Sequence, residues 1–226
     1  MEHCNPDFKK AYIAATEKLV QFGKISEFPI QISGLLKAHS DIQLHSFAWA
    51  EQHGVARSMF QSESAELQEL CGRYAIYYDE TKPETHNRFS IAHEWGHYDL
   101  KHDFDRARHD EAYYKKTEAE ANLFAAQLLM PEQVIDELKK RGNIITAPFI
   151  QRTFCVSEQA AEVRMRTLKS FPSFLRSHEE QKYDDILIDF IFKKWLNANF
   201  PHRVEFDFEA EYTKQAERER WLAEGY

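Results

Sequence analysis

Residues 89–102 read FSIAHEWGHYDLKH, and two histidines four positions apart within this stretch determine how the whole chain is interpreted. On an α-helix, residues with this spacing share one face and have Cβ atoms about 5–6 Å apart, so His93 and His97 can bind one metal ion together. Glu94 lies beside the first histidine, where its carboxylate can accept a proton from water held at the metal. We expect Asn87 to cap this helix, which should continue to about His102.

A catalytic zinc site needs a third protein ligand and an open position for water. Residues 118–131 read EAEANLFAAQLLMP, which predicts a close-packed, buried helix. In such a helix Glu118, Asn122 and Ala125 share one face, whereas Glu120 points about 200° away from Glu118. We therefore expect Glu118 to complete the site, with Asn122 one turn further along to hydrogen-bond a metal-bound imidazole. Glu120 stays open as the alternative ligand.

Length and composition limit the class of protein. The 226 residues suffice for one domain with a full core, or for one domain with a smaller appendage. The formal net charge of −8 disfavours a nucleic-acid partner, because binding to phosphates usually requires a basic face. The polar amino terminus resembles no signal peptide, and no apolar run is long enough to cross a membrane. Cys4, Cys71 and Cys155 are far apart in sequence, which favours reduced thiols in a cytoplasmic protein.

Periodicity and turn residues predict the remaining elements. Asn5-Pro6-Asp7 reads as the start of a helix that should end at Gly23, and Pro29 should precede a shorter helix. Further along, we expect a short strand at 42–44, mostly helix over 46–70, a strand at 73–78, and helices at roughly 116–129, from Pro131 to Gly142, and as a pair across 146–169. An apolar helix over 184–196, a strand with alternating Val204, Phe206 and Phe208, and a charged helix should complete the chain.

These elements predict an α+β fold that is mostly helical, with a small β-sheet beside the helices that carry the metal site. We expect residues 1–170 to form the metal-binding domain and residues 171–226 to form a helical carboxy-terminal extension. The boundary is placed near Phe171-Pro172, where the composition of the chain changes.

The stretch FSIAHEWGH, followed about twenty residues later by EAEANLFAAQLLMP, resembles the ImmA/IrrE family of zinc metallopeptidases, which are of the gluzincin type. The resemblance is strong over about 72–135. It implies that His93, His97 and Glu118 bind one zinc ion and that Glu94 is the catalytic base. It also implies hydrolysis of a peptide bond in a protein substrate, namely a helix-turn-helix repressor or antitoxin-like regulator of a mobile element or stress response. The sequence leaves open manganese or iron in place of zinc, and it leaves open the oligomeric state.

Several alternatives remain at this point. His102, His109, Tyr98, Tyr113 and Tyr114 are all candidates to polarise the scissile carbonyl. The strand at 73–78 could be an open edge that pairs with an extended substrate, or a core strand without that role. The helical pair over 146–169, with Arg164 and Arg166, could be a helix-turn-helix, although a plain helical pair is favoured. A zinc-containing regulator that binds its partner without cleaving it is the rival function.

Overall fold

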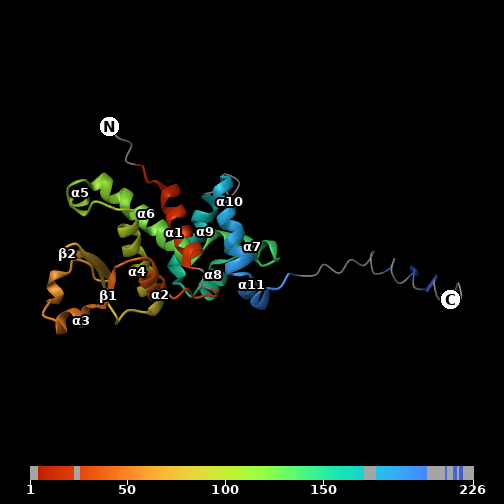
Figure 1. Ribbon diagram of the computed structural model, residues 1–226, viewed down its shortest axis with the longest axis horizontal. Coiled ribbons are helices and arrows are strands. Elements are labelled where there is room, and N and C mark those ends of the chain that lie inside the picture. The colour runs from red at the N-terminus through yellow and green to blue at the C-terminus, as the bar shows by residue number, and fades with distance from the viewer. Residues whose placement is uncertain are drawn as a thin grey trace.

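The computed structural model describes residues 5–22, 26–170 and 177–202, together with Tyr212, Ala216, Glu217, Glu219 and Arg220. Within them the fold is α+β and mostly helical, as the sequence predicts, with one small sheet at one end (Figure 1). The helices that precede the carboxy-terminal part are α1 (Phe8–Phe22), α2 (Ile32–His39), α3 (Phe47–Gln52), α4 (Glu84–Asp99), α5 (Phe104–His109), α6 (Glu111–Leu129), α7 (Glu132–Lys140), α8 (Ala147–Phe154) and α9 (Glu158–Ser170). The short 3₁₀-helix η1 spans Arg57–Met59.

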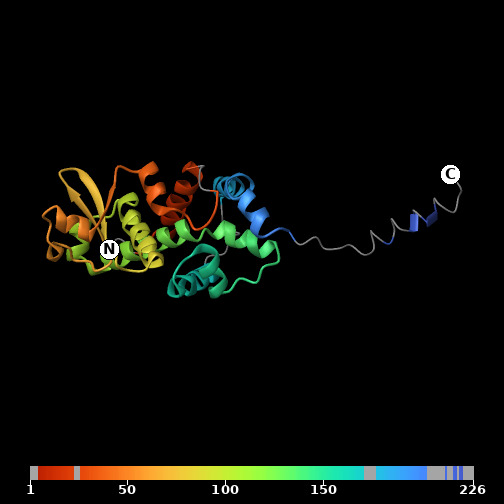
Figure 2. The same ribbon diagram turned by 90° about the horizontal axis from the view of Figure 1, so that it is seen from below.

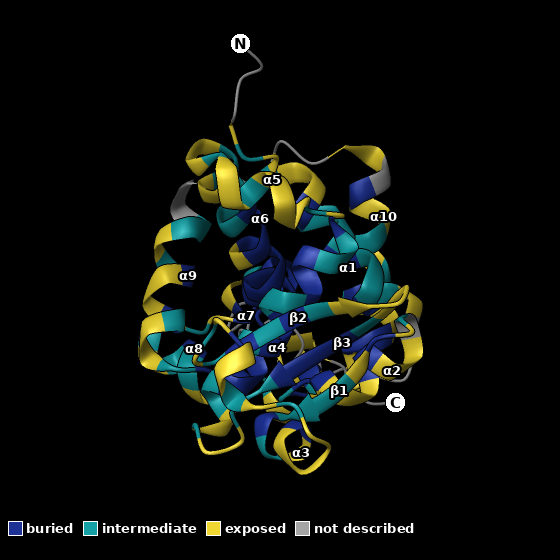
Figure 3. Cartoon of the chain, turned by 90° about the vertical axis from the view of Figure 1, so that its left-hand side faces the viewer, coloured by how far each residue is buried: buried dark blue, intermediate teal, exposed yellow. Residues whose placement is uncertain are grey.

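The sheet has three strands in the order β1-β3-β2. Strand β1 (Gln43–Ser46) pairs in parallel with β3 (Arg73–Tyr78), and β2 (Ala65–Leu70) pairs with it in antiparallel orientation. Cys71 and Gly72 join β2 to β3 and both have positive φ angles, which a two-residue hairpin turn of type I′ requires. Figure 3 shows β3 between its two neighbours. Of the two alternatives for 73–78, the open edge is therefore wrong and the core strand is observed, because the edge strands of this sheet are β1 and β2.

The expectation of mostly helix over 46–70 is wrong beyond α3. Residues 65–70 read AELQEL, a run of good helix formers, yet they form β2. Ala65 and Leu67 are buried and alternate with more exposed polar residues, as in a half-buried strand. Pairing with β3 along its whole length and the tight hairpin outweigh the local helix preference.

Three helices begin at other residues than expected. Asp7, not Asn5, caps α1, because its Oδ1 accepts a hydrogen bond from the N–H of Lys10. Helix α4 begins at Glu84 directly after Pro83, so Asn87 is a buried residue within the helix and no cap. Helix α6 starts about one turn earlier than expected, because Asp110 caps it through a hydrogen bond from the N–H of Tyr113.

The core lies where α4 crosses α6 and α1 covers α6, as the views in Figures 1 and 2 show. Gly96 lies at the crossing: a Cβ atom there would be 3.2 Å from the Cα of Ala121 and 3.2 Å from the side chain of Phe124. Trp95 is fully buried beside it and packs edge-on against Phe124. Glycine at position 96 therefore allows the two helices that bear the predicted ligands to approach closely.

Helices α8 and α9 pack against each other as a helical pair, and two buried arginines connect this pair to the core. Arg164 of α9 is buried and donates hydrogen bonds to the carbonyl of Met130 and to Oε1 of Gln127. Its guanidinium group therefore stabilises the contact between α9 and the core. Arg88 of α4 donates to the carbonyls of Phe154 and Cys155 at the end of α8, and to the carbonyl of Ile30. The helix that carries the histidines is thus linked directly to the end of α8.

The carboxy-terminal helices pack on the same core. They are α10 (His178–Ile186), the π-helical turn η3 (Leu187–Ile191) and α11 (Lys193–Asn199). The single apolar helix expected at 184–196 is thus interrupted by η3. Phe192 is fully buried and stacks on Phe28 at 4.6 Å between ring centroids, and Phe28 also contacts Phe154 of α8.

The division of the chain at residue 170 stays a prediction. The end of the first helix at Gly23, the boundary near Phe171-Pro172 and the strand around Phe206 lie outside the described residues. Of the expected closing charged helix, only Tyr212, Ala216, Glu217, Glu219 and Arg220 are described, and these five are helical. Cys71 and Cys155 are free thiols. Every helix in the described part of the chain is too short or too polar to span a lipid bilayer.

Candidate metal centre

Helices α4 and α6 bring His93, His97 and Glu118 together, and one potential ligand atom from each lies within 4.8 Å of the others. The Nε2 atoms of the two histidines are 3.0 Å apart. Oε2 of Glu118 lies 3.5 Å from Nε2 of His93, and Oε1 lies 3.2 Å from Nε2 of His97. Among the described residues, this is the one group of three or more such side chains close enough to hold a metal ion.

These distances fit a tetrahedral zinc ion. Zinc binds imidazole nitrogen and carboxylate oxygen at about 2.0–2.2 Å, which places neighbouring ligand atoms of a tetrahedron roughly 3.3 Å apart. The two Nε2 atoms are 3.0 Å apart, and they lie 3.5 and 3.2 Å from different oxygens of Glu118, so the separations are close to that value. Three ligands leave a fourth position for water, as a catalytic rather than a structural zinc site requires.

The other nitrogen of each imidazole is also engaged. Nδ1 of His93 lies 3.1 Å from Oδ1 of Asn122, one helical turn beyond Glu118. Nδ1 of His97 lies 2.8 Å from Nδ1 of His102, whose Nε2 lies 2.9 Å from Oε2 of Glu120. Glu120 therefore faces His102 and lies outside the group of three. The relationships between Glu118, Glu120 and Asn122 are those of an α-helix, as expected from their spacing.

The charges around the site favour an ionised Glu118. Burial alone would raise the pKa of this carboxyl, but the hydrogen bonds from His93 and His97 outweigh burial and hold the pKa well below its ordinary value. Burial likewise lowers the pKa of His93, but the hydrogen bond to Glu118 and the nearby carboxylates raise it above its ordinary value overall. The site thus places a carboxylate anion beside two imidazoles, the kinds of ligand that a zinc ion binds.

Glu94 lies at the free edge of β2. Its Oε2 accepts a hydrogen bond of 2.9 Å from the backbone N–H of Leu67. Burial raises the pKa of Glu94 above its ordinary value, although His93, His97 and this hydrogen bond act in the opposite direction. The sequence motif identified Glu94 but not its hydrogen-bond partner, Leu67. The donor is a backbone N–H, which any residue could supply, and residues 65–70 were expected to be helical.

The positions of the tyrosines and of His109 distinguish among the candidates that could donate a hydrogen bond to the scissile carbonyl. The hydroxyl of Tyr113 accepts a hydrogen bond from the N–H of Asp103, and the ring of Tyr98 packs edge-on against Tyr74. His109 is exposed and hydrogen-bonds the carbonyl of Asp105 in its own helix. Tyr114 is different, because the charges of Glu118 and Glu94 both raise the pKa of its hydroxyl. It lies one turn before Glu118 on α6 and is about half exposed, which places it at the mouth of the site.

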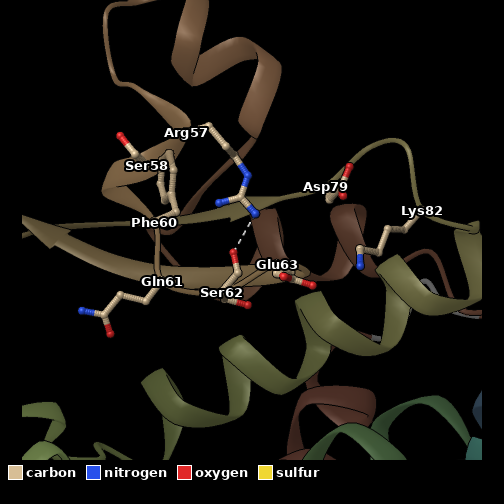
Figure 4. Close-up of a pocket in the computed structure, with 8 residues that line it drawn as sticks. All are labelled: Arg57, Ser58, Phe60, Gln61, Ser62, Glu63, Asp79 and Lys82. Carbon is tan, nitrogen blue, oxygen red and sulfur yellow. Dashed lines mark hydrogen bonds between the residues drawn. The ribbon is translucent and has the colours of Figure 1, made fainter.

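A hollow of about 640 Å³ lies where the chain enters β2 (Figure 4). Its lining carries two cations and two carboxylates among polar side chains and comprises Arg57, Ser58, Phe60, Gln61, Ser62, Glu63, Asp79 and Lys82. Arg57 donates to the carbonyl of Ser62 and lies over the ring of Phe47. The formal charges of the lining cancel, and none of the three predicted ligands belongs to it.

A comparison with protein families places the site in context. The sequence profile of the IrrE N-terminal-like domain, which defines the Peptidase M78 family, matches residues 38–166. This range covers more than half of the chain and includes β1 to β3, α4 and α6, and hence every residue of the group of three. A search among curated proteins returned no match.

Proposed function

Because the chain belongs to the Peptidase M78 family, we propose that it is a zinc-dependent endopeptidase in which His93, His97 and Glu118 hold the metal and Glu94 is the general base. The observation that carries the proposal is the arrangement of four side chains. Three of them fit a tetrahedral metal with an open position, and the fourth, Glu94, has a raised pKa and lies beside an edge strand.

A zinc ion bound at this position would polarise the scissile carbonyl and make a water molecule more acidic. Glu94 takes the proton from the attacking water and later passes it to the leaving amine. In the metal-free site, burial raises the pKa of Glu94 and so favours proton uptake by this carboxylate. The hydroxyl of Tyr114, at the mouth of the site, is the candidate to donate a hydrogen bond to the developing oxyanion.

An extended substrate would bind along the free edge of β2. In an antiparallel pair, alternate residues direct their backbone groups away from the partner strand, so one side of β2 offers hydrogen bonds to an added strand. Leu67 on this strand already donates to Glu94, which connects the edge directly to the proposed base. The substrate-binding edge, one of the two alternatives for 73–78, is thus proposed for the neighbouring strand β2.

The proposed substrate is a helix-turn-helix repressor or antitoxin-like regulator, cut at one or few sites. Support for this class comes from the family resemblance alone, and no residue of the chain specifies it. The rival proposal is a zinc-containing protein that binds such a regulator without cleaving it. Both proposals require an intact metal centre. The peptidase also requires Glu94 as a base, whereas the binding protein does not.

Co-expression separates the two proposals. The protein would be produced with the helix-turn-helix regulator encoded nearest its own gene, as wild type, as Glu94→Gln and as the control Glu111→Gln, which changes an exposed residue of α6. Intact mass spectrometry then follows the regulator. A defined fragment with the wild type and the control, but not with Glu94→Gln, supports the peptidase. An intact regulator that co-purifies with all three proteins supports the binding protein instead and overturns the peptidase for this partner.

A further inference from the structure

A buried pair, His102 and Glu120, lies directly behind His97. The side chains of His97, His102 and Glu120 are 6%, 5% and 7% exposed, so solvent does not compete for their hydrogen bonds. Nδ1 of His97 is 2.8 Å from Nδ1 of His102, and Nε2 of His102 is 2.9 Å from Oε2 of Glu120. Oε1 of Glu120 accepts a hydrogen bond from the backbone N–H of Asp7, the cap residue of α1. The chain of contacts thus runs from the ligand group to the start of the first helix.

The number of protons available fixes the direction of each hydrogen bond. Two imidazole nitrogens that face each other at 2.8 Å can share only one proton. When Nε2 of His97 is a metal ligand, the proton of that neutral ring is on Nδ1 and is donated to His102. The proton of His102 must then be on Nε2, where it is donated to Glu120. Both carboxylate oxygens of Glu120 then have donors, namely His102 at Oε2 and the N–H of Asp7 at Oε1.

The two histidines of the metal centre therefore differ in the group that contacts Nδ1. His93 faces the neutral amide of Asn122, which is exposed to solvent. His97 faces a second imidazole whose far nitrogen is bound to a buried carboxylate. A carboxylate behind a ligating histidine fixes its tautomer and makes it a stronger donor. Asn122 offers His93 no carboxylate. In this chain a carboxylate, that of Glu120, stands instead behind the other histidine, His97, and reaches it through His102.

We propose that His102 and Glu120 are positioning residues of the metal centre, which hold His97 with its proton on Nδ1 and place a negative charge behind it. The inference rests on the proposed function in one respect, because it requires a metal on Nε2 of His97. Loss of such supporting contacts typically lowers metal affinity by about 10- to 100-fold. Neither residue touches the substrate, so their effect is expected on the metal and only through it on catalysis.

Position 102 allows the sharpest test. His102→Leu removes both contacts, whereas His102→Asn keeps an oxygen that can accept from His97 but loses the contact with Glu120. Glu120→Gln removes the charge and preserves the shape. His109→Leu is the matched control, because His109 is exposed and bonds only within its own helix. Circular dichroism and thermal unfolding of the metal-free proteins identify variants that fold.

The readouts are zinc affinity, by competition with a chelator at one pH, and the visible spectrum of the cobalt-substituted protein. We expect affinity to fall about 10- to 100-fold for His102→Leu and less for His102→Asn, with a changed cobalt spectrum for both and for Glu120→Gln. The control should match the wild type. Unchanged affinity and spectra in the folded variants would overturn the positioning role and leave the peptidase proposal intact. Conversely, weakened binding supports the role even if no substrate is ever cleaved.

Discussion

The backbone N–H of Leu67 donates a hydrogen bond to the carboxylate of Glu94, so the edge strand and the proposed base are joined in one contact. This contact stabilises the ionised carboxylate, yet burial outweighs it and the pKa of Glu94 is raised above the ordinary value of 4.5. Burial of the Glu94 side chain, on α4 beside the edge of β2, is thus the main cause of its raised pKa in the metal-free protein.

We predict that Glu94 titrates above pH 4.5 in the metal-free protein. The measurement is a pH series of carboxyl carbon NMR spectra with labelled glutamate, in which the resonance missing from Glu94→Gln identifies Glu94. As pH falls, Glu94 should take up its proton above pH 4.5, because burial raises its pKa. A midpoint at or below 4.5 would show that burial does not dominate at this site.

Glu118→Gln should remove one of three ligands while the fold persists. We expect zinc affinity to fall by more than about 100-fold, since loss of a supporting contact alone lowers it about 10- to 100-fold. Isothermal titration with zinc is the measurement, and Glu111→Gln on the same helix serves as the control. If Glu118→Gln kept the affinity of the wild type, the third ligand would have to be sought elsewhere.

Much of the site could be predicted because it depends on helix geometry. An α-helix turns by 100° per residue. This alone puts His93 and His97 on one face of α4 and makes Glu118 and Glu120 point in nearly opposite directions on α6, without knowledge of the fold. The arrangement behind His97 depends instead on where α4 ends. Lys101 adopts a positive φ of 58°, which turns the chain so that the N–H of His102 bonds the carbonyl of His97. Lysine carries no signal for that conformation, so the fold-back of His102 was not predicted.

The fold shows the same division between local and long-range causes. Strand β3, with its β-branched and aromatic residues, was predicted with its observed ends, because its local preference agrees with its place in the sheet. Strand β2 was missed because its helix-forming residues become a strand only through pairing with β3. The packing of Phe192 and Trp195 against Phe28 depends on contacts between residues more than 150 positions apart, which periodicity does not reveal.

Gly96→Ala should destabilise the protein. Alanine would add about 1 kcal/mol of helix preference, but its Cβ would lie 3.2 Å from the backbone of Ala121, so α4 and α6 must separate. Overpacking of this kind costs about 1–3 kcal/mol, which exceeds the gain. Gly34→Ala is the matched control, because a Cβ atom at that exposed helical position meets nothing within 4 Å and should stabilise by up to about 1 kcal/mol. Urea denaturation of both variants measures the change in the free energy of unfolding, which should fall for Gly96→Ala and rise for Gly34→Ala. Equal stabilisation by both substitutions would contradict the close contact of α4 with α6.

Phe192→Ala tests whether the carboxy-terminal helices belong to the fold that carries the metal centre. Phe192 is fully buried and stacks on Phe28, so its truncation should lower the free energy of unfolding by about 3–5 kcal/mol. Phe190, two residues earlier, is 77% exposed, and Phe190→Ala should change stability by no more than about 0.5 kcal/mol.

The zinc-bound protein provides the decisive signal, because its unfolding can be followed by release of zinc to a chromogenic chelator. If α11 and η3 are part of one cooperative unit with α4 and α6, Phe192→Ala lowers the urea midpoint of zinc release together with that of helix loss. If residues after 170 form a separable extension, zinc release keeps the midpoint of the wild type and only part of the helical signal is lost earlier. The contacts of Phe28 with both Phe192 and Phe154 favour the cooperative outcome, because one ring then joins the end of the family domain to the helices beyond it.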